Sequence, residues 1–548
     1  MTWSTRSLAS SVFVLLALFS NVGIGQTTAT NIALPEQRNL FLDRAQDLER
    51  RQLWQQAADL YQRALRIYPE DSELRQRWNT AEQFYSLSRR YHDTSFQKDL
   101  LTLSESESLG LYREVLAKIQ THYVREVPVR DLVLSGYRTL SVALDRPIFV
   151  STNFPKTSPE VLAQLRTRVA QAAGRLGSIN SNLEASAELR NVVRLCTVHG
   201  CKYTAAAPLE FITGACESLD PYTTHLSPNR LDELYSMIDG NFVGLGVEVR
   251  GEDQGLRIVE VLPSSPAQDA GLLDEELILS VDGVRLAGHN AEEAANRLQG
   301  PDGSAVAIEV RNEAGQSRKI SIVRREVIVH SVREARILDK ATGIGYVRIE
   351  SFQKNTEEEL RAVLDDLEKQ GMRSLVVDLR GNPGGLLDVS LDVANQFIGE
   401  GVLVSTRGRA WGQNWAHRAR PKATRKIPMV VLVDSESASA SEIFASAIQD
   451  HHRGAIVGTR TYGKGSVQSI FPLTTVRTGL RLTTALFFSP TDKRLQGVGV
   501  EPDVVVTRGE SQLGEEPAVV RKPSPNSDRQ LRTAMDQLNG ASLAVQSR

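Results

Sequence analysis

The sequence predicts a multidomain α+β protein, with an N-terminal helical region, a small β-rich domain and an α/β core. Three observations carry this prediction. Apolar residues recur at helical spacing between residues 38 and 145, short alternating strands and turns fill 240–328, and apolar runs that feed helical patterns begin at residue 343. A buried strand followed by a helix is half of a βαβ unit, which indicates a parallel sheet. At 548 residues the chain is long enough for about three to four domains.

The overall composition is that of an ordinary globular protein. Hydrophobic residues make up 41%, charged residues 24%, and the net charge is −2, so the basic excess expected of a nucleic-acid-binding protein is missing. The three cysteines, Cys196, Cys201 and Cys216, include no CxxC pair, which argues against a disulfide scaffold or a zinc cluster. The segment CTVHGC leaves a local disulfide or a metal half-site open, with buried or free thiols favoured. The histidines show no metal-ligand grouping, and we predict neither a metal nor a cofactor.

Residues 1–25 have the pattern of a secretory signal peptide. One arginine precedes an apolar stretch, and the small residues Gly23 and Gly25 follow it. The apolar run is short for a membrane span, and no cysteine follows it that would accept a lipid anchor. We therefore expect an exported protein of the periplasm or cell envelope. An uncleaved leader that anchors the chain to a membrane is the alternative.

Residues 26–95 are predicted to form a helical segment with one tetratricopeptide-like unit. Two helices carry the pattern of such a repeat, through Ala45 and Leu48 in the first and Ala57, Tyr61, Ala64 and Pro69 in the second. A lone unit cannot bury its faces, so we expect it to pack on its neighbours and to serve in binding a protein partner. A generic helical hairpin explains the same residues equally well.

Residues 239–328 are predicted to form a β domain that resembles a PDZ domain. The resemblance rests on GLGV, SSPAQDAGL and VDG. PDZ domains bind extended C-termini at a sheet edge, so it implies that the loop amides of Gly244, Leu245, Gly246 and Val247 capture a terminal carboxylate. Glu275 and Glu276 stand where such domains usually have Gly-Asp, so we expect that turn to be built differently. A small β domain without a ligand is the alternative.

The α/β core is predicted to span residues 329–510. GIGYVRIESF and SLVVDL read as strands, and Thr356 with Glu359 predicts a capping box that opens a helix. The glycine pair in RGNPGGLLDVS allows backbone amides to turn inward, although a simple tight turn has the same pattern. Residues 511–548 are predicted to be a polar tail with a short helix at DRQLRTAMDQL.

The chemistry of the chain is concentrated between residues 428 and 468. PMVVLVD reads as a buried strand, and a helix with Ser437, Ser439 and Ser441 at its start follows it. A serine needs a base to become a nucleophile, and the free amides of a helix start can stabilise an oxyanion. Lys464 can be that base if burial lowers its pKa. Helix capping by serine and a solvated lysine are the alternatives, and the pattern alone does not choose among the three serines.

SASASE, a following QD and TYGKGSVQ resemble the carboxyl-terminal processing peptidases, also called tail-specific proteases. The similarity covers roughly residues 210–507, with LDPYTTHLSP near its start and ALFFSPTDKRLQGVGVEPDVVV near its end. It implies a Ser/Lys dyad in which Ser439 is the nucleophile, Lys464 the general base and Gln468 the residue that orients the lysine. It also implies an oxyanion hole made by the amides of Gly385 and Ala440.

The chain departs from this family in its helical domain, predicted at residues 96–238. In the family, helices like those of 104–145 run straight into an LDPYT segment, whereas here extra sequence lies between about 146 and 205. This insertion includes a helical stretch, VLAQLRTRVAQAAGRL, and its role stays open.

These observations predict a serine endopeptidase that cuts exported proteins near their C-termini and selects them by a PDZ domain. Its expected partners are protein substrates with free apolar C-termini, and a homo-oligomer is left open. A non-catalytic scaffold built on the PDZ and tetratricopeptide-like segments is the alternative, but it would not need both Ser439 and Lys464. A trypsin-like PDZ protease is disfavoured, because the chain lacks a GDSGG-type loop and its serine opens a helix.

Overall fold

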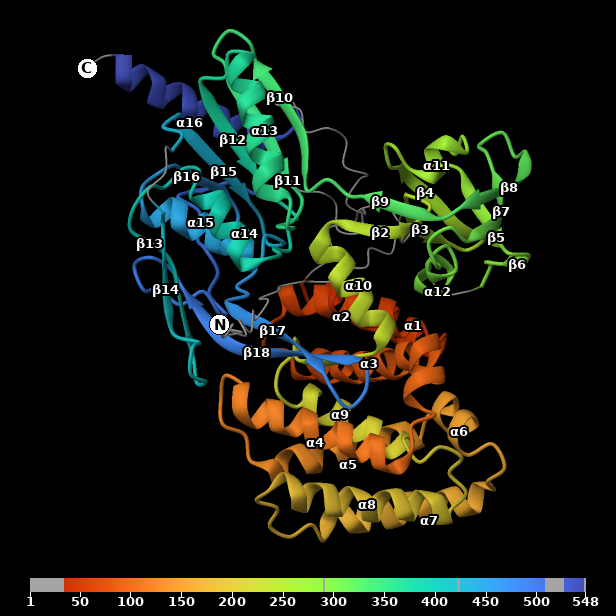
Figure 1. Ribbon diagram of the computed structural model, residues 1–548. Coiled ribbons are helices and arrows are strands. Elements are labelled where there is room, and N and C mark those ends of the chain that lie inside the picture. The colour runs from red at the N-terminus through yellow and green to blue at the C-terminus, as the bar shows by residue number, and fades with distance from the viewer. Residues whose placement is uncertain (1–33, 289–290, 421–423, 508–526, 547–548) are drawn as a thin grey trace, which may run out of the picture.

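The computed structural model describes residues 34–288, 291–420, 424–507 and 527–546. A helical region, a PDZ domain and an α/β core follow one another along the chain, which confirms the predicted multidomain α+β fold (Figure 1). The predicted signal peptide, the last residues of the predicted core (508–510) and residues 511–526 of the predicted tail lie outside the described residues. Within the described ranges, no helix has both the length and the apolar character needed to cross a membrane.

Three helices pack around one hydrophobic cluster, which contains the tetratricopeptide-like residues except the exposed Pro69. Ala45, Ala57, Tyr61 and Ala64 are all fully buried, and the small alanines allow close approach of the helices. Asp71 caps the third helix, because its side chain accepts a hydrogen bond from Leu74 N in the first turn of that helix. The helices are α1 (Leu34–Arg50), α2 (Trp54–Ile67) and α3 (Ser72–His92).

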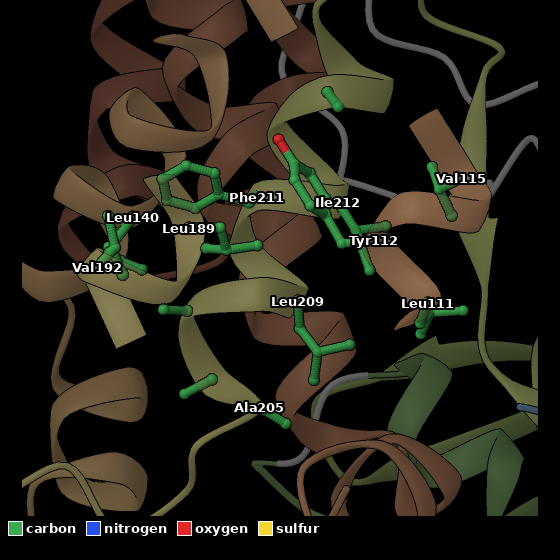
Figure 2. Packing of buried hydrophobic residues seen from close by; sticks show 14 of the residues in the cluster. Leu111, Tyr112, Val115, Leu140, Leu189, Val192, Ala205, Leu209, Phe211 and Ile212 are labelled. Atoms are coloured by element: carbon green, nitrogen blue, oxygen red, sulfur yellow. The ribbon is translucent and has the colours of Figure 1, made fainter. Parts of the chain in front are cut away.

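A larger helical domain follows and is built around helix α9, which is buried along its length. Gly136 and Gly214 let α5 and α9 approach closely: a Cβ at Gly136 would lie 2.4 Å from the Phe211 ring. The Tyr137 ring packs edge-on against Phe211, and Figure 2 shows their neighbours from α4, α8 and α9. The elements are the π-helix η1 (Phe96–Leu100) and α4 (Glu105–His122), α5 (Val129–Leu144), α6 (Pro147–Asn153), α7 (Pro159–Gly174), α8 (Asn182–Val198) and α9 (Ala206–Glu217).

The extra sequence near 146–205 forms α6, α7 and α8, of which only α7 was predicted. Leu165 and Val169 of α7 and Leu189 and Val192 of α8 are buried in the same hydrophobic cluster as α4, α5 and α9. The insertion therefore enlarges the core of the helical domain rather than forming a separate body (Figure 1).

The PDZ domain is joined to the rest of the chain by a two-stranded ribbon of β2 (Asn241–Gly244) and β9 (Arg325–Ile328). Its unusual turn is built by Glu275 itself, which takes the left-handed conformation with φ of 66°. The buried Glu276 carboxylate accepts hydrogen bonds from Leu273 N at 3.1 Å and Arg318 at 2.9 Å. The sheet has the order β3 (Val247–Glu252), β4 (Gly255–Val261), β5 (Leu277–Val281), β7 (Ala305–Arg311) and β8 (Ser317–Val323), with β6 (Val284–Arg285) on β5; its helices are α11 (Pro266–Asp269) and α12 (Ala291–Asn296).

The core is a sheet covered by helices on both faces. Val431 and Val433 pack against α13, α14 and α15, whereas Val430 and Leu432 face α16, as alternation along a strand requires. The sheet order is β10 (Val332–Asp339), β11 (Ile344–Ile349), β12 (Ser374–Asp378), β15 (Met429–Val433), β16 (Ala455–Gly458) and β19 (Val504–Val505), with only β10 antiparallel to its neighbour. The helices are α13 (Thr356–Lys369), α14 (Leu387–Ala394), α15 (Ala440–Asp450) and α16 (Arg529–Gln546).

A second sheet lies between the core and the helical domain. Val467 and Phe487 belong to the core cluster, while Leu480 and Leu482 belong to the helical cluster. This sheet has the order β1 (Thr224–Leu226), β18 (Thr478–Phe488), β13 (Val402–Gly408) and β14 (Trp415–Arg418), with β17 (Ser466–Leu473) also on β18. Helix α10 (Pro228–Asp239) then leads from β1 to the PDZ ribbon.

The predicted capping box at Thr356 and Glu359 is wrong. Thr356 is the first residue of α13, and its hydroxyl accepts a hydrogen bond from Gln353 N at 2.8 Å. Glu359 Oε2 accepts instead from Ser331 N and Val332 N at 2.9 and 3.1 Å, and its Oε1 accepts from the side chain of the N-cap residue Asn355 at 2.6 Å. A segment distant in sequence therefore takes the carboxylate that the pattern assigns to the helix start.

The C-terminal helix α16 is anchored to the core by a buried ion-pair network. Arg380, which follows β12, donates to Asp378 at 2.6 Å and also binds Asp528 at 2.8 Å, just before α16 begins. Gln530 adds a further acceptor at 3.0 Å. Arg380 directly precedes the glycine loop of the core, residues 381–385. The contacts of Arg380 with the start of α16 therefore also stabilise the start of that loop.

Candidate active site

Ser439 stands on a strained turn between a buried strand and a helix. It is the N-cap residue of α15, with φ of 62° and ψ of −111°, a region that non-glycine residues seldom occupy. A turn of this kind between strand and helix presents a nucleophilic serine in other enzyme folds. The strain at this residue therefore points to a functional position.

The structure distinguishes the three serines by what their hydroxyls bind. The Ser437 hydroxyl donates to the Leu379 carbonyl at 2.8 Å, and the Ser441 hydroxyl donates to the Asn382 carbonyl at 3.0 Å. The Ser439 Oγ is buried and has no hydrogen-bond partner among the described residues. Of these three serines, only Ser439 has a hydroxyl that donates to no backbone carbonyl among the described residues.

A buried carboxylate that sequence reasoning missed connects Ser439 to the lysine loop. Glu442 Oε2 accepts from Ser439 N at 2.7 Å and from Lys464 N at 2.8 Å, so these nitrogens lie within about 5.5 Å of each other, the sum of the two distances. Its Oε1 accepts from Thr461 Oγ1 at 2.5 Å and Gly463 N at 2.7 Å. Burial raises the pKa of Glu442, and these hydrogen bonds work in the opposite direction. The spacing S-x-x-E from Ser439 was the available signal.

Lys464 is buried in the way that a neutral lysine requires. Its side chain is 1% exposed, and burial together with the nearby Arg481 charge lowers its pKa from 10.5 to about 7. Glu442 and Asp220 act in the opposite direction. The lysine Nζ lies 4.5 Å from the centre of the Tyr222 ring. A solvated loop charge, the alternative for this lysine, does not match this burial.

Gln468 lies on β17, buried beside the same loop. Its Nε2 donates to Thr483 Oγ1 at 2.8 Å, while its Oε1 has no hydrogen-bond partner among the described residues. An unpartnered buried carbonyl is an available acceptor for an ammonium group. Gln468 therefore has a buried acceptor available on the strand that directly follows the lysine loop.

The glycine loop after β12 lies directly against the Ser439 turn. A Cβ at Gly384 would lie 2.9 Å from Ser439 Cβ and 3.0 Å from Ala440 N, so only glycine fits there. Phe352 pairs with the residues on either side of Gly385, through Gly384 O at 2.9 Å and Leu386 N at 2.7 Å. The Gly385 N–H is therefore not part of this pairing.

Ala440 is the second predicted contributor to the oxyanion hole. It is the first residue of α15, where backbone amides have no intrahelical acceptor. The amides of Gly385 and Ala440 thus belong to two backbone segments that meet beside Ser439.

Several other polar groups of the chain have surroundings that indicate a structural role. Asp450 accepts hydrogen bonds from Ser489 at 2.5 Å and Thr491 at 2.7 Å. All three cysteines are free thiols. Among the residues that the structure describes, no group of three or more His, Cys, Asp or Glu side chains is placed to hold a metal.

The predicted carboxylate loop of the PDZ domain links β2 to β3. Leu245 and Gly246 lie between Gly244, the end of β2, and Val247, the start of β3. The carbonyls of Leu245 and Gly246 accept backbone hydrogen bonds at 2.8 and 2.9 Å, while the described hydrogen bonds do not use the amides of these two residues. The Leu245 side chain is buried in the domain core. The loop is thus held through its carbonyls, with backbone donors left for a ligand.

Comparison with known proteins identifies the class to which this arrangement belongs. The family model described as peptidase family S41 matches residues 343–506, and a PDZ domain model matches residues 257–312. A carboxy-terminal-processing protease of Bartonella bacilliformis is 37% identical over 303 residues, which cover 54% of this chain and 68% of that protein. A carboxyl-terminal-processing protease of Synechocystis sp. is 34% identical over 325 residues, covering 59% and 74%.

A chloroplastic carboxyl-terminal-processing peptidase of Arabidopsis thaliana is also similar, with 32% identity over 307 residues that cover 53% of this chain and 58% of that protein. These similarities confirm the predicted enzyme class and exclude the non-catalytic scaffold as the overall description. The chain belongs to peptidase family S41 and is a carboxyl-terminal processing serine protease with a PDZ domain.

Proposed function

We propose that this protease is a Ser/Lys endopeptidase that cuts exported proteins near their C-termini. The observation that carries the proposal is the shared contact of Ser439 N and Lys464 N with one Glu442 oxygen, beside an uncommitted serine hydroxyl and a buried lysine. In this mechanism neutral Lys464 takes the proton of Ser439 as the hydroxyl oxygen attacks the scissile carbonyl. Gln468 orients the lysine through its free carbonyl oxygen.

The amides of Gly385 and Ala440 stabilise the oxyanion of the tetrahedral intermediate. Collapse of that intermediate expels the amine of the C-terminal fragment, which takes the proton from Lys464, and leaves an acyl ester on Ser439. Water then attacks the ester with Lys464 again accepting a proton. One oxyanion donor contributes about 3–4 kcal/mol of transition-state stabilisation in a comparable protease.

Ser439 is fully buried, so the substrate reaches it only after a movement of the surrounding segments. The PDZ domain is our candidate for coupling this movement to substrate. Its Leu245, Gly246 and Val247 amides capture the terminal carboxylate, and Val247 and Val249 line a pocket for the last apolar side chain. An occupied PDZ domain then releases the site from its closed arrangement.

The dyad is tested with peptide substrates and the variants Ser439→Ala and Lys464→Arg. Both should abolish cleavage while the protein stays folded, since arginine does not deprotonate in the working pH range. Ser437→Ala and Ser441→Ala are matched controls that should retain turnover. Wild-type cleavage by Ser439→Ala, or an active Lys464→Arg enzyme, would refute the assignment.

Selection by the C-terminus is tested by amidating one peptide substrate. Amidation removes the terminal charge and leaves the scissile region unchanged, so capture of the carboxylate predicts a clear fall in kcat/KM. Equal kcat/KM for the free and amidated peptides would exclude this mode of selection and leave the peptidase assignment intact.

The exported location is also a proposal, which rests on the signal-peptide pattern of residues 1–25. N-terminal sequencing of the protein from fractionated cells tests it. A mature chain that begins after the apolar run and leaves the cytoplasm is expected. An intact N-terminus in the cytoplasmic fraction would contradict export.

A further inference from the structure

The LDPYT segment has no part in the mechanism above, yet the structure brings it onto the catalytic lysine. Asp220 Oδ1 accepts from Tyr222 N and Thr223 N, each at 2.8 Å, and its Oδ2 accepts from the Thr223 hydroxyl at 3.0 Å. These bonds close a tight turn between α9 and β1. Tyr222, at the centre of this turn, places its ring 4.5 Å from Lys464 Nζ.

Arg481, on β18, fastens this turn to the sheet that carries the lysine loop. Its Nε donates to the Tyr222 carbonyl at 3.0 Å, and Arg481 pairs with Thr224 of β1 on one side and Ile470 of β17 on the other. Thr483, two residues along the same strand, donates its amide to Thr223 Oγ1 at 3.3 Å. Thr483 Oγ1 in turn accepts from Gln468 Nε2 at 2.8 Å. One strand thus contacts both the turn and the glutamine.

We propose that Arg481 is a positioning residue for Lys464, acting through the Tyr222 turn and through its own positive charge. The inference rests on the proposed role of Lys464 as general base. In this proposal the LDPYT segment contributes to the reaction by packing against the Lys464 side chain.

The surroundings of Lys464 shift its pKa in two opposite directions. The Tyr222 ring face, Asp220 and Glu442 all favour the ammonium form, the ring because of its negative face. Burial and the Arg481 charge favour the neutral amine. The pKa of Arg481 is itself lowered to about 10 by burial and by Arg89 of α3, so it still holds its charge at neutral pH.

Removing Arg481 takes away the only charge among these groups that opposes the ammonium. Arg481→Met should therefore move the midpoint of the acid limb of the kcat/KM profile upward by about one pH unit. The activity at pH 6.5 should fall about tenfold, while activity at high pH approaches that of the wild type. Arg481→Lys, which keeps the charge, should leave the midpoint near its wild-type position.

The matched control is Arg477→Met, an exposed arginine just before the same strand. It should leave the profile unchanged. A purely structural role for Arg481 predicts instead that Arg481→Met lowers kcat/KM by the same factor at every pH, and that result would overturn the proposal. An equal shift in Arg481→Lys would show that charge is not the cause.

A second pair of variants tests the ring contact if Arg481→Met does not fold. Tyr222→Leu removes the aromatic face and should lower the midpoint, whereas Tyr222→Phe keeps the face and should not. An unchanged midpoint in Tyr222→Leu would refute the ring contact as a determinant.

The lysine can also be titrated without catalysis, by 13C NMR of ε-labelled lysine in the Ser439→Ala background. Its signal is assigned by its loss in Lys464→Met. A Lys464 that titrates near neutral pH and does not respond to Arg481→Met refutes this inference alone. A Lys464→Arg enzyme that still cleaves peptide refutes the base itself.

Discussion

Burial of Lys464 should make the wild-type protease less stable than a variant that lacks the amine. A pKa held at about 7 instead of 10.5 corresponds to about 5 kcal/mol, since each pKa unit is about 1.4 kcal/mol. Between pH 7 and 10.5 the unfolded chain carries a proton on this lysine that the folded protein lacks, so stability rises with pH in that window. Below pH 7 both states carry the proton and the full penalty applies.

Lys464→Met keeps the length of the side chain and places a thioether against the Tyr222 ring, a favourable contact. The variant should therefore exceed the wild type in free energy of unfolding by several kcal/mol at pH 6, on the order of the penalty above. This difference should shrink steadily as the pH approaches 10.

Calorimetric Tm values of both proteins at pH 6, 7, 8 and 9 measure this, with about 2–4 °C expected per kcal/mol for a domain of this size. Comparing the two proteins at each pH cancels other titrating groups. Lys340→Met, at an exposed turn, is the control and should give a pH-independent difference. A Tm gain for Lys464→Met that is the same at pH 6 and 9, or no gain at all, would refute a depressed lysine pKa.

Three further substitutions test other parts of the structure. Glu442→Gln replaces a carboxylate that accepts four hydrogen bonds with a group that also donates, so kcat should fall at least about tenfold; unchanged kcat would remove Glu442 from the site's support. Asp528→Asn weakens the network around the buried Arg380 and should lower core stability by about 1–3 kcal/mol, seen as a lower Tm, and an unchanged Tm would show that α16 is held by apolar contacts alone. Glu275→Gly relieves a left-handed backbone and should stabilise the PDZ domain by about 1 kcal/mol, measured as slower amide exchange in β5; faster exchange would mean that the glutamate side chain contributes more than its strain removes.

Elements whose signals are local could be predicted from the sequence. The Val-rich runs before residue 434 and before residue 379 are strands, because a parallel sheet covered on both faces needs continuous apolar residues. The insertion shows the limit of this reasoning: α7 was predicted and α8 was not, although both pack in one cluster.

The two capping-box patterns show why the rest could not be predicted. At Thr356 the pattern is present and the box does not form, because Ser331 and Val332 take the Glu359 carboxylate. At Ser439 the same S-x-x-E pattern was not interpreted as a capping box, and there the Glu442 carboxylate does accept a hydrogen bond from Ser439 N. Local sequence cannot decide between these outcomes, since the competing donors come from distant segments.

The candidate site residues also divide into those that the sequence predicts and those that only the fold brings together. Family resemblance singled out Ser439 and Lys464, whereas Tyr222 and Arg481 reach the lysine only because β1 and β17 both pair with β18.

Because the chain enters and leaves the PDZ domain through one two-stranded ribbon, this domain can be removed as a unit. Both connections run through β2 and β9, and the last pair of the ribbon joins Gly244 to Arg325. Because these residues face each other across an antiparallel ladder, a two-residue turn can replace everything between them and leave a closed hairpin. The same junction accepts a foreign recognition domain whose ends lie side by side. The PDZ domain can therefore be exchanged for another domain without a change to the residues of the α/β core.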